Sequence, residues 1–557
     1  MASRWRLFSS LSQAGKPDLL GSAMLVLCLT GWVAAQEPVL APGASLKQET
    51  TVGSSTEGPA WHPEQGLLFS GANRITRLDK SGRADVFRED AGTNGLLFDL
   101  QGRLLACESR QRRVTRTEPD GSMTVLADQY DGKRFNTPND LTIDAVGRIY
   151  FSDPRYGDRS GMEQLDAEGR AIEGVYRIDP DGTVHRVIAH EVDRPNGLLV
   201  SPDGRYLYVA DNNNSTLGAA RKLWRFDLTA DGDVRPESKH LMFDWRTGRG
   251  PDGMCIDRAG RLYVAAGLND PHPPAETADE FTGGVYVLSP EGKLLEFIPV
   301  PADEVTNCEL GGDDLRTLYI TAGPALWSIR VTTPGQPAWP RVYEIARARS
   351  PLRIDGRLDE PAWEAAADVG SFCFPWWKQG QREPTAAKLL WDDQHLYVTF
   401  RCDDAHIWGE KTERDSPVYQ DDCVEVFTSP NPEQPQQYFN IEMNVKGAYL
   451  DFYHPGGPST REEWNPGGIQ IATTVQGTLN NDSDTDDHWI LEAAVPLASF
   501  SGVAKHIPPQ PGDVWRMNLN RLGGKTNPQH SQWSAGDPQK TSFHAPPYFG
   551  RVIFVEQ

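Results

Sequence analysis

GPDGMCIDRAGRLYVAAG, residues 250–267, places one acid, Asp252, between a proline and a glycine directly before an apolar run. A turn containing Asp and Gly follows, and Arg261 then opens a second apolar run. This order is typical of two short strands joined by a tight turn. A carboxylate at the start of such a hairpin either caps a turn or points at a ligand. One copy is compatible with both interpretations, so recurrence of the pattern decides between them.

The same plan recurs five more times along the chain, with a polar residue, a short strand, a turn and a second strand. Three copies are close to the first: NGLLFDLQGRLLACE (94–108), NDLTIDAVGRIYFSD (139–153) and NGLLVSPDGRYLYVAD (196–211). Two are weaker: EGPAWHPEQGLLFSGAN (57–73) and NCELGGDDLRTLYITAG (307–323). Each copy is followed by a third strand, and usually by a further turn and strand. Units of four antiparallel strands favour a six-bladed β-propeller over residues 43–331, within an all-β chain.

The last unit ends at ALWSIRV, residues 325–331, and lacks an outer strand. We predict that SLKQETTV, residues 45–52, supplies that strand and closes the ring, since closure removes exposed strand edges.

The first strand of each blade lines the channel of a propeller, so the residues that precede these strands are expected to converge. By repeat they are Glu57, Asn94, Asn139, Asn196, Asp252 and Asn307. Two carboxylates and four amides facing one axis need compensation, and a cation is the usual remedy. Because the set offers only oxygen donors, it favours calcium, with magnesium or manganese as substitutes. The alternative for each single residue is an ordinary role in a turn.

Residues 50–331 resemble the SMP-30/gluconolactonase/LRE-like family of six-bladed propellers. The motifs that carry the resemblance are TEGPAWHP, FNTPNDLTIDAVGRIYFSDPRYG, RPNGLLVSPDGRYLYVADN and GPDGMCIDRAGRLYVA. The resemblance implies a metal-dependent lactonase, with diisopropylfluorophosphatase-like phosphotriesterases as near relatives. The sixth copy, TNCEL, has no histidine of the kind that marks the phosphotriesterase branch, which favours lactones.

The resemblance also implies roles for particular residues. Glu57, Asn139, Asn196 and Asp252 match the positions that surround the cation, and Asn139 can act there through water or substrate. The cation is Ca²⁺ or another divalent ion such as Mg²⁺, Mn²⁺ or Zn²⁺. Asn94 and Asn307 complete the ring with outer contacts, and the expected substrate contacts are Asn139, Arg134 and Asn94. Asp252 is the expected catalytic base, and Asp211 is the reserve.

After the proline-rich linker at 332–341 the repeat ends, and alternating strands predict a β-sandwich over residues 342–557. IDGRLDEPAW (354–363) and the ending WSAGDPQKTSFHAPPYFGRVIF (533–554) resemble the family 9 carbohydrate-binding module. The resemblance implies a sugar binder that stacks aromatic rings on pyranose faces. Trp408, Trp464 and Trp533 are the candidates for stacking, and a role in the core is the alternative for each. Asp403-Asp404 and Asp421-Asp422 are candidates for a calcium site or for solvated loops.

The net charge of −22 and the pI near 5.0 argue against nucleic acid or anionic lipid as a partner, because both require a positive field. AMLVLCLTGWVAA (23–35) follows early basic residues and ends in small ones, which predicts a signal peptide over residues 1–35. The mature protein is then periplasmic or secreted, without stable membrane insertion. An uncleaved anchor is the alternative. Cys402 and Cys423 either form a disulfide in that compartment or stay as buried thiols, as expected for Cys107, Cys255 and Cys308.

The leading hypothesis is therefore an exported, gluconolactonase-like carboxylic-ester hydrolase that acts on a sugar lactone and binds carbohydrate through its second domain. One alternative is a non-catalytic sugar-binding propeller in which the ion only stabilises the fold. The other is a phosphotriesterase.

Overall fold

The computed structural model describes residues 38–338, 341–534, 536–537 and 540–556. The predicted signal peptide with Cys28 and two residues of the linker lie outside these ranges, so the structure does not test the signal peptide. None of the described helices is long and apolar enough to cross a bilayer.

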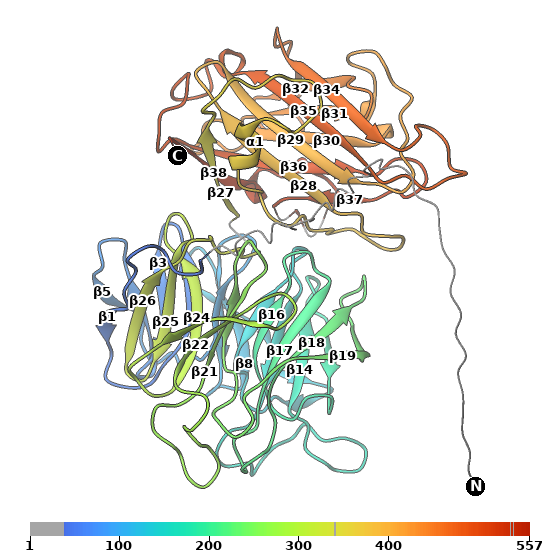
Figure 1. Cartoon of the computed structure of the whole chain (residues 1–557). Helices are drawn as coiled ribbons and strands as arrows, with labels where there is room; N and C mark the ends of the chain where they lie inside the picture. Colours follow the sequence, from blue (N-terminus) through green and yellow to red (C-terminus); the bar gives the residue numbers. More distant parts are fainter. Residues whose placement is uncertain (1–37, 339–340, 535, 538–539, 557) are drawn as a thin grey trace, which may run out of the picture. The chain divides into compact units, whose positions relative to one another are not determined.

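Six four-stranded sheets follow one another along the first part of the described chain and form the blades of a propeller (Figure 1). The first strands are β2 (Thr56–His62), β6 (Leu96–Phe98), β12 (Leu141–Ile143), β16 (Pro195–Val200), β20 (Met254–Ile256) and β24 (Val305–Gly311). The second strands are β3 (Gly66–Gly71), β7 (Leu104–Glu108), β13 (Ile149–Asp153), β17 (Tyr206–Asn212), β21 (Leu262–Ala266) and β25 (Thr317–Ala322). The third strands are β4 (Arg74–Leu78), β8 (Arg113–Thr117), β14 (Gly174–Ile178), β18 (Arg221–Leu228), β22 (Gly284–Leu288) and β26 (Ala325–Arg330). The outer strands are β5 (Ala84–Arg88), β9 (Met123–Ala127), β15 (Val184–Ile188), β19 (Val234–Asp244), β23 (Leu294–Pro299) and β1 (Lys47–Thr51).

The recurring Asp-x-x-Gly-Arg sequence forms the turn between the first two strands of a blade. The Asp257 carboxylate accepts from the backbone N–H groups of Ala259 and Arg261, both at 3.0 Å, and from Nε of Arg261 at 2.6 Å. The same arrangement recurs at Asp99 and Asp144. The acid therefore holds the turn, and the arginine that opens the second strand neutralises its charge. The repeated sequence sets a repeated hairpin.

The prediction of ring closure is confirmed. β1 pairs antiparallel with β26, from Lys47 opposite Ser328 to Thr51 opposite Ala325, so the first strand of the described chain completes the last blade (Figure 1). The Glu49 carboxylate accepts from Oγ of Ser328 at 2.6 Å across this pair. The sixth blade therefore joins segments from both ends of the propeller, and its third strand has a neighbour on each side.

The second domain is built on one twelve-stranded sheet of mixed direction, in the order β33-β32-β31-β30-β36-β38-β27-β28-β29-β35-β34, with β37 beside β36. Its strands are β27 (Val342–Arg347), β28 (Thr385–Trp391), β29 (His395–Asp403), β30 (Cys423–Ser429), β31 (Tyr438–Asn444), β32 (Tyr449–His454), β33 (Glu462–Glu463), β34 (Gln470–Gln476), β35 (His488–Pro496), β36 (Val514–Leu522), β37 (His530–Gln532) and β38 (Gly550–Val555). Short helical segments interrupt them: α1 (Pro361–Ala365), η1 (Val418–Gln420), η2 (Leu497–Phe500) and η3 (Pro546–Tyr548). Residues 351–356, which precede α1, form no strand.

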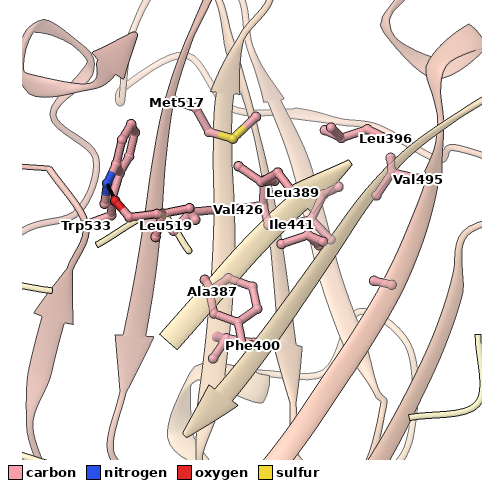
Figure 2. Close-up of a cluster of buried hydrophobic side chains, with 14 of the residues drawn as sticks. Ala387, Leu389, Leu396, Phe400, Val426, Ile441, Val495, Met517, Leu519 and Trp533 are labelled. Atoms are coloured by element: carbon pink, nitrogen blue, oxygen red, sulfur yellow. Dashed lines mark hydrogen bonds between the residues drawn. The ribbon is translucent and has the colours of Figure 1, made fainter. Parts of the chain in front are cut away.

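The sheet curls so that its two halves share one core, which gives the predicted sandwich. Leu389 on β28 and Val495 on β35 pack in the same cluster as Val426 on β30 and Ile441 on β31, although these strands lie far apart in the sheet. Figure 2 shows these side chains gathered between the strands. Alternate residues of each strand face this core, which leaves the other face of β32-β31-β30-β36 free for polar groups.

The six cysteines of the described residues are all buried, unpaired thiols. Cys402 lies on β29 and Cys423 on β30, and these strands are not neighbours in the sheet. The structure therefore supports the buried-thiol alternative for this pair.

Candidate functional site

The six predicted ring residues lie at or just before the first strands, and backbone contacts pass from blade to blade around them. The N–H of Gly95 donates to the carbonyl of Asn139 at 2.7 Å, and the N–H of Gly253 donates to the carbonyl of Thr306 at the same distance. Oγ1 of Thr306 donates to the carbonyl of Thr56 at 2.7 Å, which links the last blade to the first. These hydrogen bonds join the second blade to the third, the fifth to the sixth and the sixth to the first at the starts of their first strands.

Glycine follows most ring residues because neighbouring blades approach each other there. A Cβ atom at Gly197 would lie 2.1 Å from the carbonyl oxygen of Asp252 in the next blade. A Cβ atom at Gly253 would lie 1.9 Å from Cγ of Asn307. Neither position has room for a side chain, so the PNG and PDG motifs bring Asn196, Asp252 and Asn307 close together.

Side chains also meet across the axis. Nδ2 of Asn307, in the sixth blade, donates to Oδ2 of Asp140, in the third blade, at 3.3 Å. The third and sixth blades face each other in a six-bladed ring, so this hydrogen bond spans the channel. Oδ1 of Asn307 accepts from the N–H of Cys308 at 2.8 Å. Both ends of this amide are engaged, so Asn307 supports Asp140 and its oxygen does not face the centre.

Glu57 and Asp252 are acids that disfavour each other's charge. Burial raises the pKa of Glu57 well above its ordinary value, and the Asp252 carboxylate raises it further. Burial also raises the pKa of Asp252 to about 6, against the opposing effects of Arg249 and of the Asn196 amide. Two acids with raised pKa values, the half-buried Glu57 of the first blade and the buried Asp252 of the fifth, are typical of a site that holds a cation or transfers protons.

Asn196 has an unsatisfied oxygen at this place. Its side chain is 3% exposed, and its Nδ2 donates to the hydroxyl of Tyr156 at 3.0 Å. Oδ1 of Asn196 has no hydrogen-bond partner among the described residues. A buried acceptor without a partner costs about 1–3 kcal/mol, and a cation would satisfy it.

The donors near the axis therefore fit a hard divalent ion. Glu57, Asn196 and Asp252 supply carboxylate and amide oxygens, and Asn139 lies partly buried in the neighbouring third blade. The described residues contain no cluster of three or more His, Cys, Asp or Glu side chains set for a metal. This ring does not qualify as such a cluster, because amides make up half of its predicted ligands.

Four residues of this site were missed by the sequence reasoning. Asp140 is buried next to Asn139, and burial raises its pKa to about 7, with a smaller contribution from Asp252. Nη2 of Arg249 donates to Oδ2 of Asp252 at 3.3 Å, and Nη1 of Arg249 lies 3.9 Å from Oε1 of Glu304. Tyr156 orients Asn196. Asp140 could have been noticed in the sequence, because it occupies the position at which most copies of the repeat have glycine. Arg249, Glu304 and Tyr156 lie on loops that the repeat does not align.

The other predicted site residues are placed as follows. Asn94 is partly buried, and its carbonyl accepts from Oγ of Ser70 at 2.7 Å. Arg134 is exposed on the hairpin of β10 (Gln129–Tyr130) and β11 (Lys133–Arg134), where its N–H donates to Glu163 at 3.0 Å. Asp211 accepts from the N–H of Arg194 at 3.0 Å and from the indole of Trp224 at 3.1 Å. These contacts give Asp211 a structural role.

The second domain has a cavity of about 460 Å³ over the polar face of β32-β31-β30-β36. Its lining combines aromatic rings with acids, amides and histidines: Trp376, Tyr419, Glu425, Phe427, Asn440, Glu442, Leu450, Phe452, His454, Pro458, Arg461, Leu522, His530, Thr541, Ser542, Phe543 and His544. A volume in the range of roughly 300–1,000 Å³ is usual for a small-molecule site. This cavity is the candidate ligand site of the domain.

The three tryptophans predicted to stack on sugar do not line this cavity. Trp533 is 1% exposed, and its indole donates to the carbonyl of Val369 at 2.9 Å, so it belongs to the core (Figure 2). Trp464 packs on Phe439 and Phe500. Lys525 lies over the ring of Trp408, 3.8 Å from its centroid. Burial in the core leaves no free aromatic face at Trp533, whereas Trp464 and Trp408 are half-buried and Lys525 covers one face of Trp408.

Three acids of the two acidic pairs in this domain are buried, which departs from the predicted solvated loops. Asp404 accepts from Arg521 at 3.0 Å. Asp421 accepts from Nδ2 of Asn444 at 2.8 Å, and Asp422 from the N–H of Trp408 at 2.5 Å. Asp403 accepts from Arg401. Each of the four carboxylates therefore has at least one donor from the protein.

Acid is expected to destabilise the second domain through His454. This ring lies flat on Tyr438, with centroids 4.3 Å apart, and its Nε2 is 2.9 Å from Oδ1 of Asn440. Burial lowers the pKa of His454 to about 4. The unfolded chain then binds more protons between pH 6.5 and 4, so stability falls as the pH falls through this window, by up to about 3 kcal/mol.

Chemical denaturation of wild type and His454→Gln at pH 7 and pH 4 measures this contribution. The variant should lose less stability on acidification, because glutamine does not titrate. His240→Gln, at an exposed site on β19, is the control and should behave as wild type. Equal acid losses in wild type and His454→Gln would contradict the prediction.

Comparisons with known proteins agree with this architecture. A family model described as the SMP-30/Gluconolactonase/LRE-like region matches residues 55–323, and one described as carbohydrate family 9 binding domain-like matches residues 354–557. The chain is 32% identical over 307 residues to a gluconolactonase of Zymomonas mobilis, a match that covers 50% of this chain and 79% of that protein. It is 30% identical over 292 residues to a 6-deoxy-6-sulfogluconolactonase of Pseudomonas putida, and this match covers 50% of this chain and 85% of that protein. A solved gluconolactonase structure from Xanthomonas campestris is 33% identical, covers 53% of this chain and 91% of that one, and has a TM-score of 0.44.

The family model described as the SMP-30/Gluconolactonase/LRE-like region falls on the propeller, whose first strands carry the ring of oxygen donors. The chain belongs to the SMP-30/gluconolactonase/LRE-like family and also carries a carbohydrate family 9 binding domain-like region.

Proposed function

We propose that the propeller is an exported, divalent-cation-dependent lactonase that acts on sugar lactones, and that the second domain binds carbohydrate. The observation that carries the enzymatic part is the partnerless Oδ1 of Asn196 beside Glu57 and Asp252. Glu57, Asn196 and Asp252 would hold the ion, with Asn139 next to them. Calcium is the first choice because all four groups are oxygen donors.

A divalent cation at this site supplies positive charge that stabilises the negative charge developing on the lactone carbonyl oxygen. Asp252 serves as general base and takes a proton from the attacking water at a carboxylate oxygen. Burial raises the pKa of Asp252 to about 6 without a cation, and a cation beside the carboxylate would favour its ionised form, which is the form that takes a proton. As the water oxygen bonds to the carbonyl carbon, the ring C–O bond breaks, and the proton held on Asp252 passes to the departing ring oxygen.

Neighbouring side chains hold this arrangement. Arg249 keeps Asp252 oriented through its hydrogen bond, and Tyr156 fixes the amide of Asn196 so that Oδ1 faces the site. The partly buried amides of Asn139 and Asn94 are offered to the hydroxyl groups of the substrate. The N–H and C=O ends of an amide suit hydroxyls, which both donate and accept hydrogen bonds.

Hydrolysis of glucono-1,5-lactone, measured above its spontaneous rate with and without a chelator, tests this proposal. We expect hydrolysis that disappears with the chelator and returns when calcium is added. An organophosphate ester serves as the comparison substrate and should react far more slowly. Chelator-resistant hydrolysis, or a preference for the organophosphate, would overturn the assignment as a cation-dependent lactonase.

The 460 Å³ cavity is the candidate carbohydrate site of the second domain. Trp376, Tyr419 and Phe543 give it aromatic rings, which would pack on the C–H faces of a pyranose, and its acids and the amide of Asn440 would bond hydroxyl groups. Calorimetric titration with monosaccharide glycosides measures such binding.

A further inference from the structure

The floor of the 460 Å³ cavity is a row of buried polar side chains on three adjacent strands. Glu425 on β30 stands directly opposite Glu442 on β31, and Asn440 and His454 follow on β31 and β32. All four side chains are at most 6% exposed. Two carboxyls side by side on one sheet face repel each other when both are ionised, so such a pair calls for a positive partner.

Hydrogen bonds within the row leave acceptors unsatisfied. Nδ2 of Asn440 donates to Oε1 of Glu442 at 2.9 Å, and Oδ1 of Asn440 can only accept, so Nε2 of His454, 2.9 Å away, carries the proton. In neutral His454 the other nitrogen, Nδ1, is then an acceptor. Nδ1 of His454 and Oε2 of Glu442 have no partner among the described residues. A ligand that carries hydrogen-bond donors would therefore satisfy the acceptors of this row.

The charged groups around the row also leave an excess of negative charge at the two acids. Arg461 is the single Lys or Arg in the lining, and it is exposed, with its guanidinium over the ring of Phe452, 4.2 Å from the centroid. Burial lowers the pKa values of His454 and His544 to about 4, and that of His530 as well, so these rings are neutral at pH 7. Two acids thus face one exposed cation.

The remaining titratable groups near the row add no positive charge. Burial raises the pKa of the Tyr438 hydroxyl and that of the Cys423 thiol, so both groups stay neutral at pH 7. Tyr419 also lines the cavity, from η1, and its side chain carries no cationic form. The neighbouring elements therefore supply no positive charge that would offset the negative charge of the two acids.

The pKa values of the two acids are raised in this environment. Burial raises the pKa of Glu442 to about 7, and burial followed by the charge of Glu442 raises the pKa of Glu425 well above its ordinary value. The pair therefore retains a proton in the absence of a ligand. A cation in the cavity would favour its release.

One lining donor is also unsatisfied. Nε1 of Trp376 has no partner among the described residues. An oxygen of the ligand would accept from it. The cavity thus offers acceptors and negative charge at its floor, an indole donor on its wall, and aromatic faces around both.

We propose that this cavity binds an amino sugar, with the ligand's primary ammonium between Glu425 and Glu442 and its pyranose ring against the aromatic side chains. This inference rests on the proposed carbohydrate-binding function of the domain and names the class of sugar. The ammonium supplies three donors to the partnerless acceptors, and the sugar oxygens accept from Trp376. Hydrogen bonds to charged groups are stronger than those between neutral groups, so the amine decides affinity.

Calorimetric titration of the full chain with three matched glycosides tests the proposal: methyl β-glucosaminide, methyl β-glucoside and methyl N-acetyl-β-glucosaminide, at pH 6.5. We expect the free amine to bind about tenfold or more tightly than the other two. Titrations in two buffers of different ionisation enthalpy should show proton release with the amine alone. Equal affinities for the three sugars would overturn the amine assignment and leave carbohydrate binding intact. Absence of binding by all three would overturn carbohydrate binding as well.

The variant Glu442→Gln keeps the size of the side chain and an oxygen for Asn440, and it removes one charge. We expect it to lose much of the preference for the glucosaminide over the glucoside, because Glu425 alone then faces the ammonium. Glu433→Gln, the same change at an exposed loop position, is the control and should keep the wild-type preference. If Glu442→Gln does not fold, the comparison of the three ligands on the wild type still decides. Ethylammonium that binds as tightly as the glucosaminide would overturn the assignment to a sugar.

Discussion

Replacement of Asp252 by asparagine is expected to lower the turnover of a sugar lactone by about 100- to 10,000-fold, the usual contribution of a general base. The asparagine side chain would keep the shape of the aspartate, but it cannot take a proton at neutral pH. The change also removes one of the two carboxylates that would hold the cation and leaves Arg249 without its hydrogen-bonded anion. The measurement is kcat for glucono-1,5-lactone in the presence of calcium, together with the melting temperature.

Asp211→Asn is the matched control. Its carboxylate accepts from two backbone N–H groups and the indole of Trp224, so asparagine there should lower the melting temperature and leave kcat near the wild-type value. Turnover by Asp252→Asn within tenfold of wild type would contradict the assigned role. So would an equal loss of turnover in Asp211→Asn.

Deletion of residues 43–52 is expected to lower the melting temperature of the propeller by about 5–20 °C. This segment contains β1, which pairs with β26 at four positions, and its loss exposes the edge of the sixth blade. Net hydrogen-bond contributions of about 0.5–1.5 kcal/mol give about 2–6 kcal/mol for such a strand. Each kcal/mol shifts the melting temperature of a large domain by about 2–4 °C.

Differential scanning calorimetry of the deletion variant measures this effect. A chain that begins at residue 39 and keeps residues 43–52 is the control, because it retains the complete blade. The deletion should also increase self-association, since an open strand edge pairs with other chains. An unchanged melting temperature would show that β1 does not close the ring in solution.

The propeller could be predicted from the sequence because each blade repeats the same local rules. The Asp-x-x-Gly-Arg turn needs only residues within five positions of one another, as the contacts of Asp257 and Arg261 illustrate. This turn recurs in three blades, and six units with the same order of strands, the last of them short of a strand, also predicted the closure by β1. Local hydrogen bonds that recur along the chain are visible without any knowledge of distant contacts.

The site was less accessible to sequence reasoning. Glu57, Asn196 and Asp252 were found because the repeat aligns them. Arg249 and Tyr156 were not, because their approach to the ring depends on loops of unequal length. Asp140 could have been noticed, since it occupies a position where glycine is usual. Its hydrogen bond with Asn307 links residues 167 positions apart in the chain.

In the second domain, alternation predicted the strands, but it did not single out the aromatic residues that line the cavity. Trp533 and Trp464 look like any other tryptophan in the sequence, and only packing shows that one is enclosed in the core and the other lies on Phe439. Trp376 lies on a loop, whereas Glu425 and Glu442 lie on the paired strands β30 and β31. The cavity joins segments that are distant in sequence, and no local pattern shows that they meet.

The sequence by itself determined the number of blades, the turn that shapes each hairpin, and the identity of the oxygen donors that start the first strands. Those features depend on interactions between near neighbours in the chain, which a repeat displays directly. Only the tertiary structure decided which amide keeps a free oxygen, which arginine faces Asp252, and which face of the second sheet forms a cavity. These features depend on side chains that meet across the ring or across the sheet. For such pairs, the number of residues between them in the sequence does not show how close they lie in space.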